Sequence, residues 1–309
     1  MLRYAAILVT VTSALFATAN PAAADFRLER RLALNPGGTF TLDSDAGSVT
    51  LIGDSSSGAV ITVTSPDDHL TDRLDIQFAT VSGSATVTAK RRVGSFGRLF
   101  DGFRGNVHFE VHVPRATLVE VHTGGGSVDA SGVAGPARIH TSGGSIAVTD
   151  VDKDLDASTS GGSIHVEHVK GRAEVHTSGG SINVTGVSGD LRATTSGGSV
   201  DVRDAGGRVE AHSSGGSVSA AFVRGNNRGG DLSTSGGGVH AEIDPRAALS
   251  IDASTSGGRV VTDVPVTVHG SLSGRSLHGD LNGGGAMLQM HSSGGGIRIS
   301  AIPASSASR

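Results

Sequence analysis

The chain is built on one heptapeptide that recurs along most of its length. The sequence His-Thr-Ser-Gly-Gly-Ser-Ile stands at residues 140–146 and 176–182, and seven further segments depart from it at one or a few positions. The Gly-Gly pairs begin at residues 125, 143, 161, 179, 197 and 215, a constant spacing of 18, and then at 236 and 257, a spacing of 21. A fixed period of this size is typical of a protein made of stacked structural repeats.

Apolar and polar residues alternate within each repeat. Ala137, Ile139 and Thr141 share one face of an extended arm, and Ile146 and Val148 share one face of the next. This alternation is typical of short β-strands with one buried face, and the Gly, Asp and Ser residues between the arms are typical of turns. Each repeat is therefore predicted to form two strands and two turns, and we expect the Gly-Gly step to supply a positive φ.

One such repeat cannot bury its apolar face alone, whereas a stack of repeats can. We predict an all-β fold, a single-stranded parallel β-helix (β-solenoid) with 18-residue rungs and the right-handed winding that crossover connections favour. The alternation also points one column of hydroxyl groups inward, where they can bond to the turn backbone. The column consists of Thr123, Thr141, Thr159, Thr177, Thr195 and Ser213.

The sequence divides into four regions. Residues 1–24 are typical of a secretory signal peptide, with basic Arg3, an apolar run and a small-residue cleavage site at 22–24. Residues 25–105 form an N-terminal β region that ends in an irregular loop at 90–105, and residues 106–301 form the repeat β-helix, with degenerate terminal layers from 264 to 290. Residues 302–309 form a polar tail that we expect to be disordered.

Composition narrows the classes of function. The leader predicts export to the periplasm or the extracellular space, and its apolar run is too short for a transmembrane segment. The net charge of −4, spread in both signs, argues against nucleic-acid binding. The chain has no cysteine and no tryptophan, and its one tyrosine, Tyr4, lies in the leader. No Gly-Lys-Ser/Thr follows the glycines, so they do not form a phosphate loop, and we expect no cofactor.

The segment 90–105 breaks the period and is the strongest candidate for a specific contact. It groups apolar anchors with arginines, the mixture that is enriched in interface hot spots. The residues concerned are Phe96, Arg98, Phe100, Phe103 and Arg104. The alternative interpretation is a loop that folds back over the end or flank of the coil and buries its phenylalanines.

Two polar patterns raise the question of metal binding. His122 and His140 occupy adjacent rungs beside Glu120, a weak zinc candidate because such sites need at least three converging ligands; the alternative is a solvated surface column. Alternating aspartates at 150, 152, 154 and 156 suggest calcium. However, glycine-rich calcium repeats place aspartate after Gly-Gly-x-Gly-x, whereas Ser-Ile-x-Val follows the glycines here. We therefore assign no metal site.

The sequence resembles a known family in three places: 111–128, the Thr-Ser-Gly-Gly-Ser-Ile/Val copies, and 281–285 with 291–297. The resemblance is to the secreted bacterial adhesin-like family of unknown function, whose members are β-helical, and it covers residues 40–300. That family commonly has a Ser-Gly-Asp-Ile corner where this chain has Gly-Gly-Ser-Ile. The resemblance implies a noncatalytic role at the cell surface or envelope and assigns no site residues.

Three functions remain open. The first is a noncatalytic, exported, adhesin-like or scaffold protein that presents a rod surface to a protein or glycan partner. The second is a polysaccharide-acting β-helix enzyme, a lyase or hydrolase, suggested by fold analogy alone. The third is end-to-end self-association through uncapped parallel strands. The evenly repeated polar columns and the lack of tryptophan favour the first.

Overall fold

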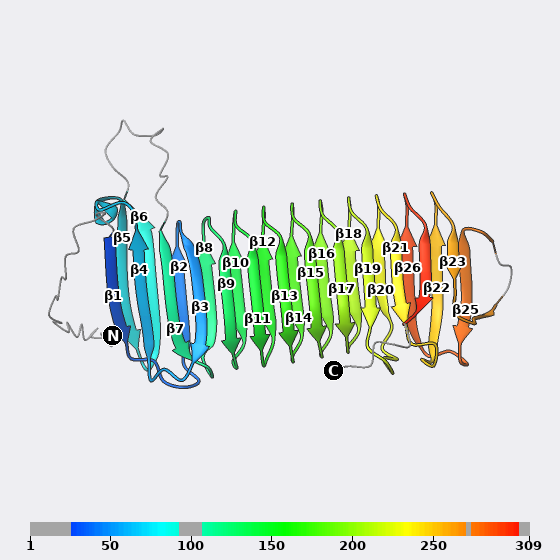
Figure 1. Ribbon diagram of the computed structural model, residues 1–309, viewed down its shortest axis with the longest axis horizontal. Coiled ribbons are helices and arrows are strands. Elements are labelled where there is room, and N and C mark those ends of the chain that lie inside the picture. Colours follow the sequence, from blue (N-terminus) through cyan, green and yellow to red (C-terminus); the bar gives the residue numbers. More distant parts are fainter. Residues whose placement is uncertain (1–25, 93–106, 270–272, 303–309) are drawn as a thin grey trace, which may run out of the picture.

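The computed structural model describes residues 26–92, 107–269 and 273–302, which form a flat rod (Figure 1). Its strands make two long sheets, sheet A with 13 strands and sheet B with 14. Among these residues the only helix is α1 (Leu70–Arg73), and no helix is long and apolar enough to cross a membrane. The predicted leader, almost all of the predicted tail and most of the 90–105 loop lie outside the described residues.

Seven consecutive rungs form the middle of the rod. Each rung contributes one strand to sheet B and the next to sheet A, and neighbouring rungs pair in parallel, so that Arg138 faces both Glu120 and Asp156. The predicted β-solenoid with 18-residue rungs is therefore confirmed. The rungs are β8 (Leu118–Thr123) with β9 (Val128–Val133), β10 (Ala137–Thr141) with β11 (Ile146–Val151), β12 (Leu155–Thr159) with β13 (Ile164–Val169), β14 (Ala173–Thr177) with β15 (Ile182–Val187), β16 (Leu191–Thr195) with β17 (Val200–Ala205), β18 (Val209–Ser213) with β19 (Val218–Phe222), and β20 (Gly230–Thr234) with β21 (Val239–Ile243).

The core is the layer between the two sheets. Ile139 and Val175 on sheet B face Val148 and Val166 on sheet A, and each is at most 2% exposed. Because every rung supplies the same small set of Val, Ile, Ala and Leu, the layers are alike, and their burial stabilises the rod in proportion to its length.

The inward hydroxyl column lies at the edge of this core, as predicted. The hydroxyl of Thr159 donates to the carbonyl of Gly144 at 2.8 Å, and that of Thr177 donates to Gly162 at 2.7 Å. The same oxygen of Thr177 accepts from the amide of Gly180 at 3.4 Å. Each hydroxyl therefore joins the turn of its own rung to the turn of the rung before it.

The reason for glycine at this corner differs from the expectation. Within the heptapeptide copies only Gly126 has a positive φ, of 112°, so the predicted backbone conformation is wrong for the others. Instead, a Cβ on Gly144 or Gly162 would come within 3.0 Å of the carbonyl oxygen of the preceding rung, closer than Cβ atoms approach in proteins. Close stacking of backbones, not left-handed geometry, therefore requires glycine here.

The N-terminal end departs from sequence order. The rung β2 (Thr39–Ser44) with β3 (Ser48–Asp54) lies between β8–β9 and the rung β6 (Ser84–Arg91) with β7 (His108–Pro114). Antiparallel strands then close both sheets: β4 (Ala59–Ser65) and β1 (Phe26–Leu32) in sheet A, and β5 (Leu74–Val81) in sheet B. The 90–105 segment connects β6 to β7, the chain position that a glycine corner holds in other rungs, and β6 extends to Arg91.

The C-terminal end shows the same interleaving. The last strands, β26 (Ala286–Ser292) and β27 (Ile297–Ala301), lie between β20–β21 and the rung β22 (Leu249–Thr255) with β23 (Val260–Thr262). The strands β25 (Ser276–Leu281) and β24 (Thr267–Val268) then add antiparallel to sheet B. The last heptapeptide copy is therefore not the end of the rod: His291 lies between Ser233 and Ser254, and the copies at Gly236 and Gly257 are not neighbours.

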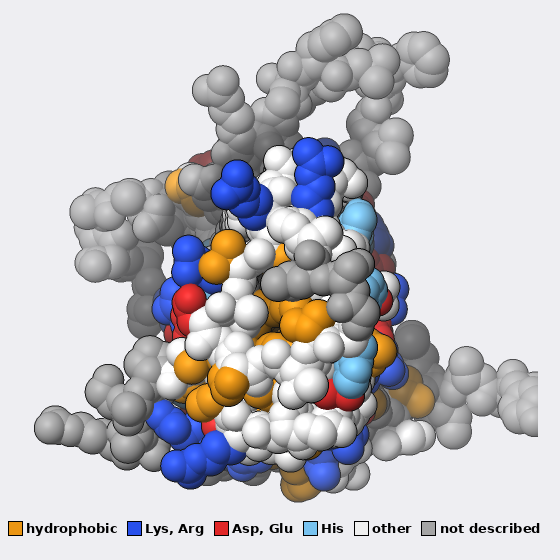
Figure 2. All heavy atoms as spheres, turned by 90° about the vertical axis from the view of Figure 1, so that its right-hand side faces the viewer, with side chains coloured by type: hydrophobic (Ala, Val, Ile, Leu, Met, Phe, Trp, Pro, Cys, Tyr) orange, Lys and Arg blue, Asp and Glu red, His pale blue; other side chains and the backbone are white. Residues whose placement is uncertain are grey.

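The expectation of end-to-end self-association rested on open parallel edges, and only one sheet edge, at β23, is of this kind in the described chain; self-association itself stays a prediction. The outermost strands are antiparallel at three of the four sheet edges, and at the C-terminal end β23 and β24 have only three and two residues. Short edge strands are a common means of limiting edge pairing. Figure 2 looks onto this end, where apolar side chains gather near the middle and charged ones lie around the rim. Exposed apolar residues of the nearby strands are Val261 and Met287.

Candidate binding groove

The sheet A strands of five middle rungs, β9, β11, β13, β15 and β17, contain a one-residue bulge near their ends. In β11 the buried residues Ile146, Val148 and Val151 are spaced by two and then by three. The strand pairing passes from Thr149–Glu167 to Val151–Val169, so one residue of each strand is left out of register. These left-out residues stack into what we call the bulge row: Gly132, Asp150, His168, Gly186 and Asp204, with φ of 72°, 59°, 55°, 73° and 54°.

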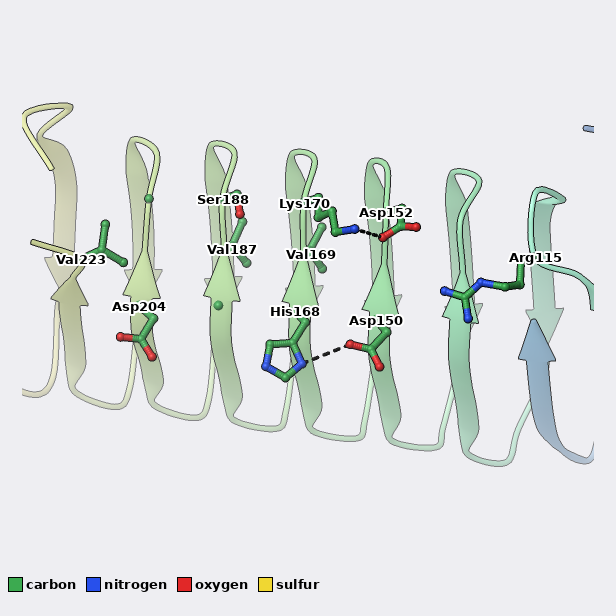
Figure 3. A pocket seen from close by; sticks show the side chains of 12 residues that line it. Arg115, Asp150, Asp152, His168, Val169, Lys170, Val187, Ser188, Asp204 and Val223 are labelled. Carbon is green, nitrogen blue, oxygen red and sulfur yellow. Dashed lines mark ion pairs between the residues drawn. The ribbon is translucent and has the colours of Figure 1, made fainter. Parts of the chain in front are cut away.

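A groove of about 630 Å³ runs beside the bulge row, on the rod edge opposite the glycine corner (Figure 3). Buried Val169 and Val187 form part of its floor. Six charged or titratable side chains line it, supplied by three rungs and by the turn after β7. They are Arg115, Asp150, Asp152, His168, Lys170 and Asp204.

Four of these side chains form pairs between adjacent rungs. The Nδ1 atom of His168 lies 3.2 Å from Oδ1 of Asp150, and Nζ of Lys170 lies 2.6 Å from Oδ1 of Asp152. The hydrogen bond from Lys170 is the main cause that lowers the pKa of Asp152. Asp204 is exposed and makes no hydrogen bond or ion pair with any residue that the structure describes.

This arrangement suits the binding of a charged group more than acid–base chemistry. Two of its three carboxylates face His168 and Lys170 of the next rung, and the third, Asp204, has no partner among the described residues. Within the described ranges no cluster of three His, Asp or Glu side chains could hold a metal ion.

A second cluster lies at the N-terminal end of the same edge. The Nδ1 atom of His112 on β7 lies 2.8 Å from Oδ2 of Asp54 on β3, and its Nε2 lies 3.5 Å from Glu110. The hydrogen bond to Asp54 is the main cause that raises the pKa of His112. The amide of Arg115 donates to the carbonyl of Asp54 at 3.1 Å, so this cluster adjoins the groove.

The contact site predicted from the sequence lies in the 90–105 segment. Phe96, Arg98, Phe100, Phe103 and Arg104 lie outside the described residues, so their role stays a prediction.

The weak zinc candidate lies on the outer face of sheet B. The rings of His122 and His140 have centroids 6.0 Å apart and are tilted by 45° to each other. Glu120 is engaged by Arg138 at 2.9 Å, and Nδ1 of His140 lies 2.9 Å from the hydroxyl of Ser158. Both partners are surface neighbours from the next rung, as in the predicted surface column.

The alternating aspartates do not converge on one point. Asp150 and Asp152 line the groove, Asp156 lies on the outer face of sheet B, and Asp154 accepts from the amide of Arg172 at 2.9 Å. Sequence reasoning missed the groove. The change of apolar spacing from two to three in the sheet A arms of five consecutive rungs, β9 to β17, was the signal that could have revealed the bulge row.

The solved structures that match this chain are distant from it in sequence. A "putative adhesin" from Bacteroides fragilis is 13% identical, with 90% of this chain and 97% of that chain covered and a TM-score of 0.43. A "putative lipid binding protein" from Parabacteroides distasonis is 12% identical, with the same coverage and a TM-score of 0.44. A "putative cell adhesion protein" from Clostridium sporogenes is 9% identical, covers 90% and 100%, and has a TM-score of 0.29.

No curated protein matches this chain. The family described as Toastrack DUF4097 matches residues 41–282, from the first interleaved rung at β2 to the end of β25. This match spans well over half of the sequence and agrees with the stacked parallel strands of both sheets. The chain therefore belongs to the Toastrack DUF4097 family.

Proposed function

We propose that this protein is a noncatalytic, exported binding or scaffold protein that presents the sides of its rod to a partner in the bacterial envelope or outside the cell. The leader-like residues 1–24 support export. The partner is a protein or glycan surface, and the charged groove is the feature of the rod best suited to a specific contact.

One observation carries this proposal: the exposed charges recur from rung to rung and pair with each other. Arg138 lies 2.9 Å from Glu120, and Arg192 lies 3.1 Å from Glu210. In the groove, Asp152 pairs with Lys170 in the same way. An enzyme acting on polysaccharide needs carboxylates that differ from their neighbours and face a substrate cleft, and paired columns do not favour that chemistry.

The test uses the mature chain, residues 25–309. It is incubated with alginate, polygalacturonate and hyaluronan, and new reducing ends and unsaturated products are measured. We expect no product with any of them. We also expect saturable binding to at least one isolated envelope fraction of the producing bacterium. Catalytic release of sugar ends would overturn the proposal in favour of a polysaccharide lyase or hydrolase.

A further inference from the structure

The bulge row contains the same pair of residues twice. Gly132 is followed one rung later by Asp150, and Gly186 is followed one rung later by Asp204. Because glycine has no side chain, the row of side chains is interrupted at each glycine, and an aspartate stands on one side of each gap; at Gly132 the carbonyl oxygen of Gly53 lies on the other side, 2.7 Å from the position that a Cβ would take. The two gaps are three rungs apart on the same edge of the rod.

The protein places its own arginine over the first gap. The side chain of Arg115 reaches from the turn after β7 across the next rung (Figure 3), and its Nη1 atom lies 3.7 Å from the position that a Cβ on Gly132 would take. Its charge contributes to the lowered pKa of Asp152 in the rung beyond. A guanidinium group thus has a place over the bulge row beside aspartates.

The second gap has no such occupant among the described residues. Its near wall is the ring of His168, whose Cδ2 atom lies 3.2 Å from the position of a Cβ on Gly186. Its far wall is Asp204, whose carboxylate has no partner there. His168 itself is engaged by Asp150 on its other side, at 3.2 Å.

The geometry points to the Gly186 gap as a binding site for a guanidinium group, the side chain of an arginine on a partner protein, held by Asp204. The assignment rests on charge complementarity and on the precedent of Arg115 at the equivalent gap. A planar guanidinium matches a carboxylate with two donors, and the bare glycine backbone leaves room for its flat group beside the carboxylate. This inference deepens the proposed binding role and rests on it.

The test follows amide NMR shifts of the labelled mature protein while Nα-acetyl-arginine amide is added. We expect weak binding, in about the millimolar range because the site is exposed, with shifts centred on Gly186 and Asp204. Asp204→Asn should weaken binding about tenfold, the effect of losing a charge-assisted hydrogen bond. The matched control, Asp129→Asn, removes another exposed carboxylate with no partner in the described chain and should bind as wild type does.

Two further samples make the test specific. Arg115→Ala should open the first gap, so that a second set of shifts appears around Gly132 and Asp150. The uncharged isostere Nα-acetyl-citrulline amide should bind to neither gap. Equal binding by wild type and Asp204→Asn, equal binding of the citrulline probe, or no new shifts in Arg115→Ala would each overturn the inference.

These outcomes are separate from the test of the proposed function. Failure at Asp204 with no polysaccharide cleavage would remove only the arginine site. Cleavage of a polysaccharide would overturn the noncatalytic role whatever Asp204→Asn does.

Discussion

The two long edges of the rod are built on opposite principles. At the glycine corner the backbones of successive rungs touch, the side chains are glycine and serine, and buried threonine hydroxyls bond the turns together. At the opposite edge a bulge lifts one residue out of the sheet in each of five rungs, and charged side chains of neighbouring rungs pair beside it. The difference teaches that close stacking restricts the choice of residue, whereas the bulge frees it: Gly, Asp and His all occupy the bulge row.

The largest expected effect lies at the glycine corner. Gly144→Ala places a Cβ against the backbone of Gly126 and Ser127 in the preceding rung, where no flexible side-chain atom can move aside. We expect a loss of about 3 kcal/mol or more in the free energy of unfolding, measured by urea denaturation. The adjacent Gly143→Ala is the control, because its Cβ would lie 3.8 Å from Gly125 Cα, an ordinary contact. Equal losses in the two variants would refute the stacking explanation.

The next effect concerns the hydroxyl column. Thr177→Val keeps the shape of the side chain but removes the donor to Gly162 and the acceptor for Gly180. Leaving these backbone groups without a partner should cost about 1–3 kcal/mol of unfolding free energy. Thr177→Ser keeps the hydroxyl, as Ser213 and Ser292 do in the same column, and should cost less than about 1 kcal/mol. A Thr177→Val variant as stable as wild type would mean that the hydroxyl column does not contribute to stability.

A smaller, pH-dependent effect is expected at His112. Because the hydrogen bond to Asp54 raises the pKa of His112 above 6.5, its contribution to stability is complete below that value and is lost as the pH rises through the folded-state pKa. Asp54→Asn should lower the pKa of His112 and remove this contribution, worth less than about 1 kcal/mol for a partly exposed pair. Histidine NMR titration measures the pKa. An unchanged titration in Asp54→Asn would contradict the assignment.

The smallest effect is expected at the paired charges of the groove. Lys170→Met removes the hydrogen bond that lowers the pKa of Asp152, so this pKa should rise toward its usual value. The urea midpoint should hardly change, because exposed ion pairs contribute little to stability. Carboxyl NMR titration is the measurement. A large loss of stability in Lys170→Met would contradict the claim that the glycine corner, and not the charged edge, stabilises the rod.

Much of the repeat region was predictable from sequence because identical layers impose an identical pattern. The 18-residue spacing placed Thr141, Thr159 and Thr177 in one inward column, and the column is there. The bulge row was missed because its members share no residue type, so no motif marks it. Only the apolar spacing, two and then three residues as in Ile164, Val166 and Val169, records it.

The order of the terminal rungs was not predictable from the same pattern. The heptapeptide at 291–297 has every feature of a rung, but a repeat does not encode which neighbours it will choose, since all rungs offer similar edges. After β23 the chain forms β24 and β25 on the outer side of β22, and β26 then lies between β20 and β22. The groove likewise depends on where side chains of different rungs meet, which is a property of stacking and not of any one repeat.

The most direct test of the stacking order uses introduced cysteines, because the natural chain has none. Three double variants are oxidised and their disulfides are identified by mass spectrometry: Ser233→Cys with His291→Cys, Ser254→Cys with His291→Cys, and Ser233→Cys with Ser254→Cys. Adjacent rungs lie about 4.8 Å apart, within reach of a disulfide, and alternate rungs lie beyond it. The account predicts bonds in the first two variants and none in the third. A bond between positions 233 and 254, with none to 291, would contradict it.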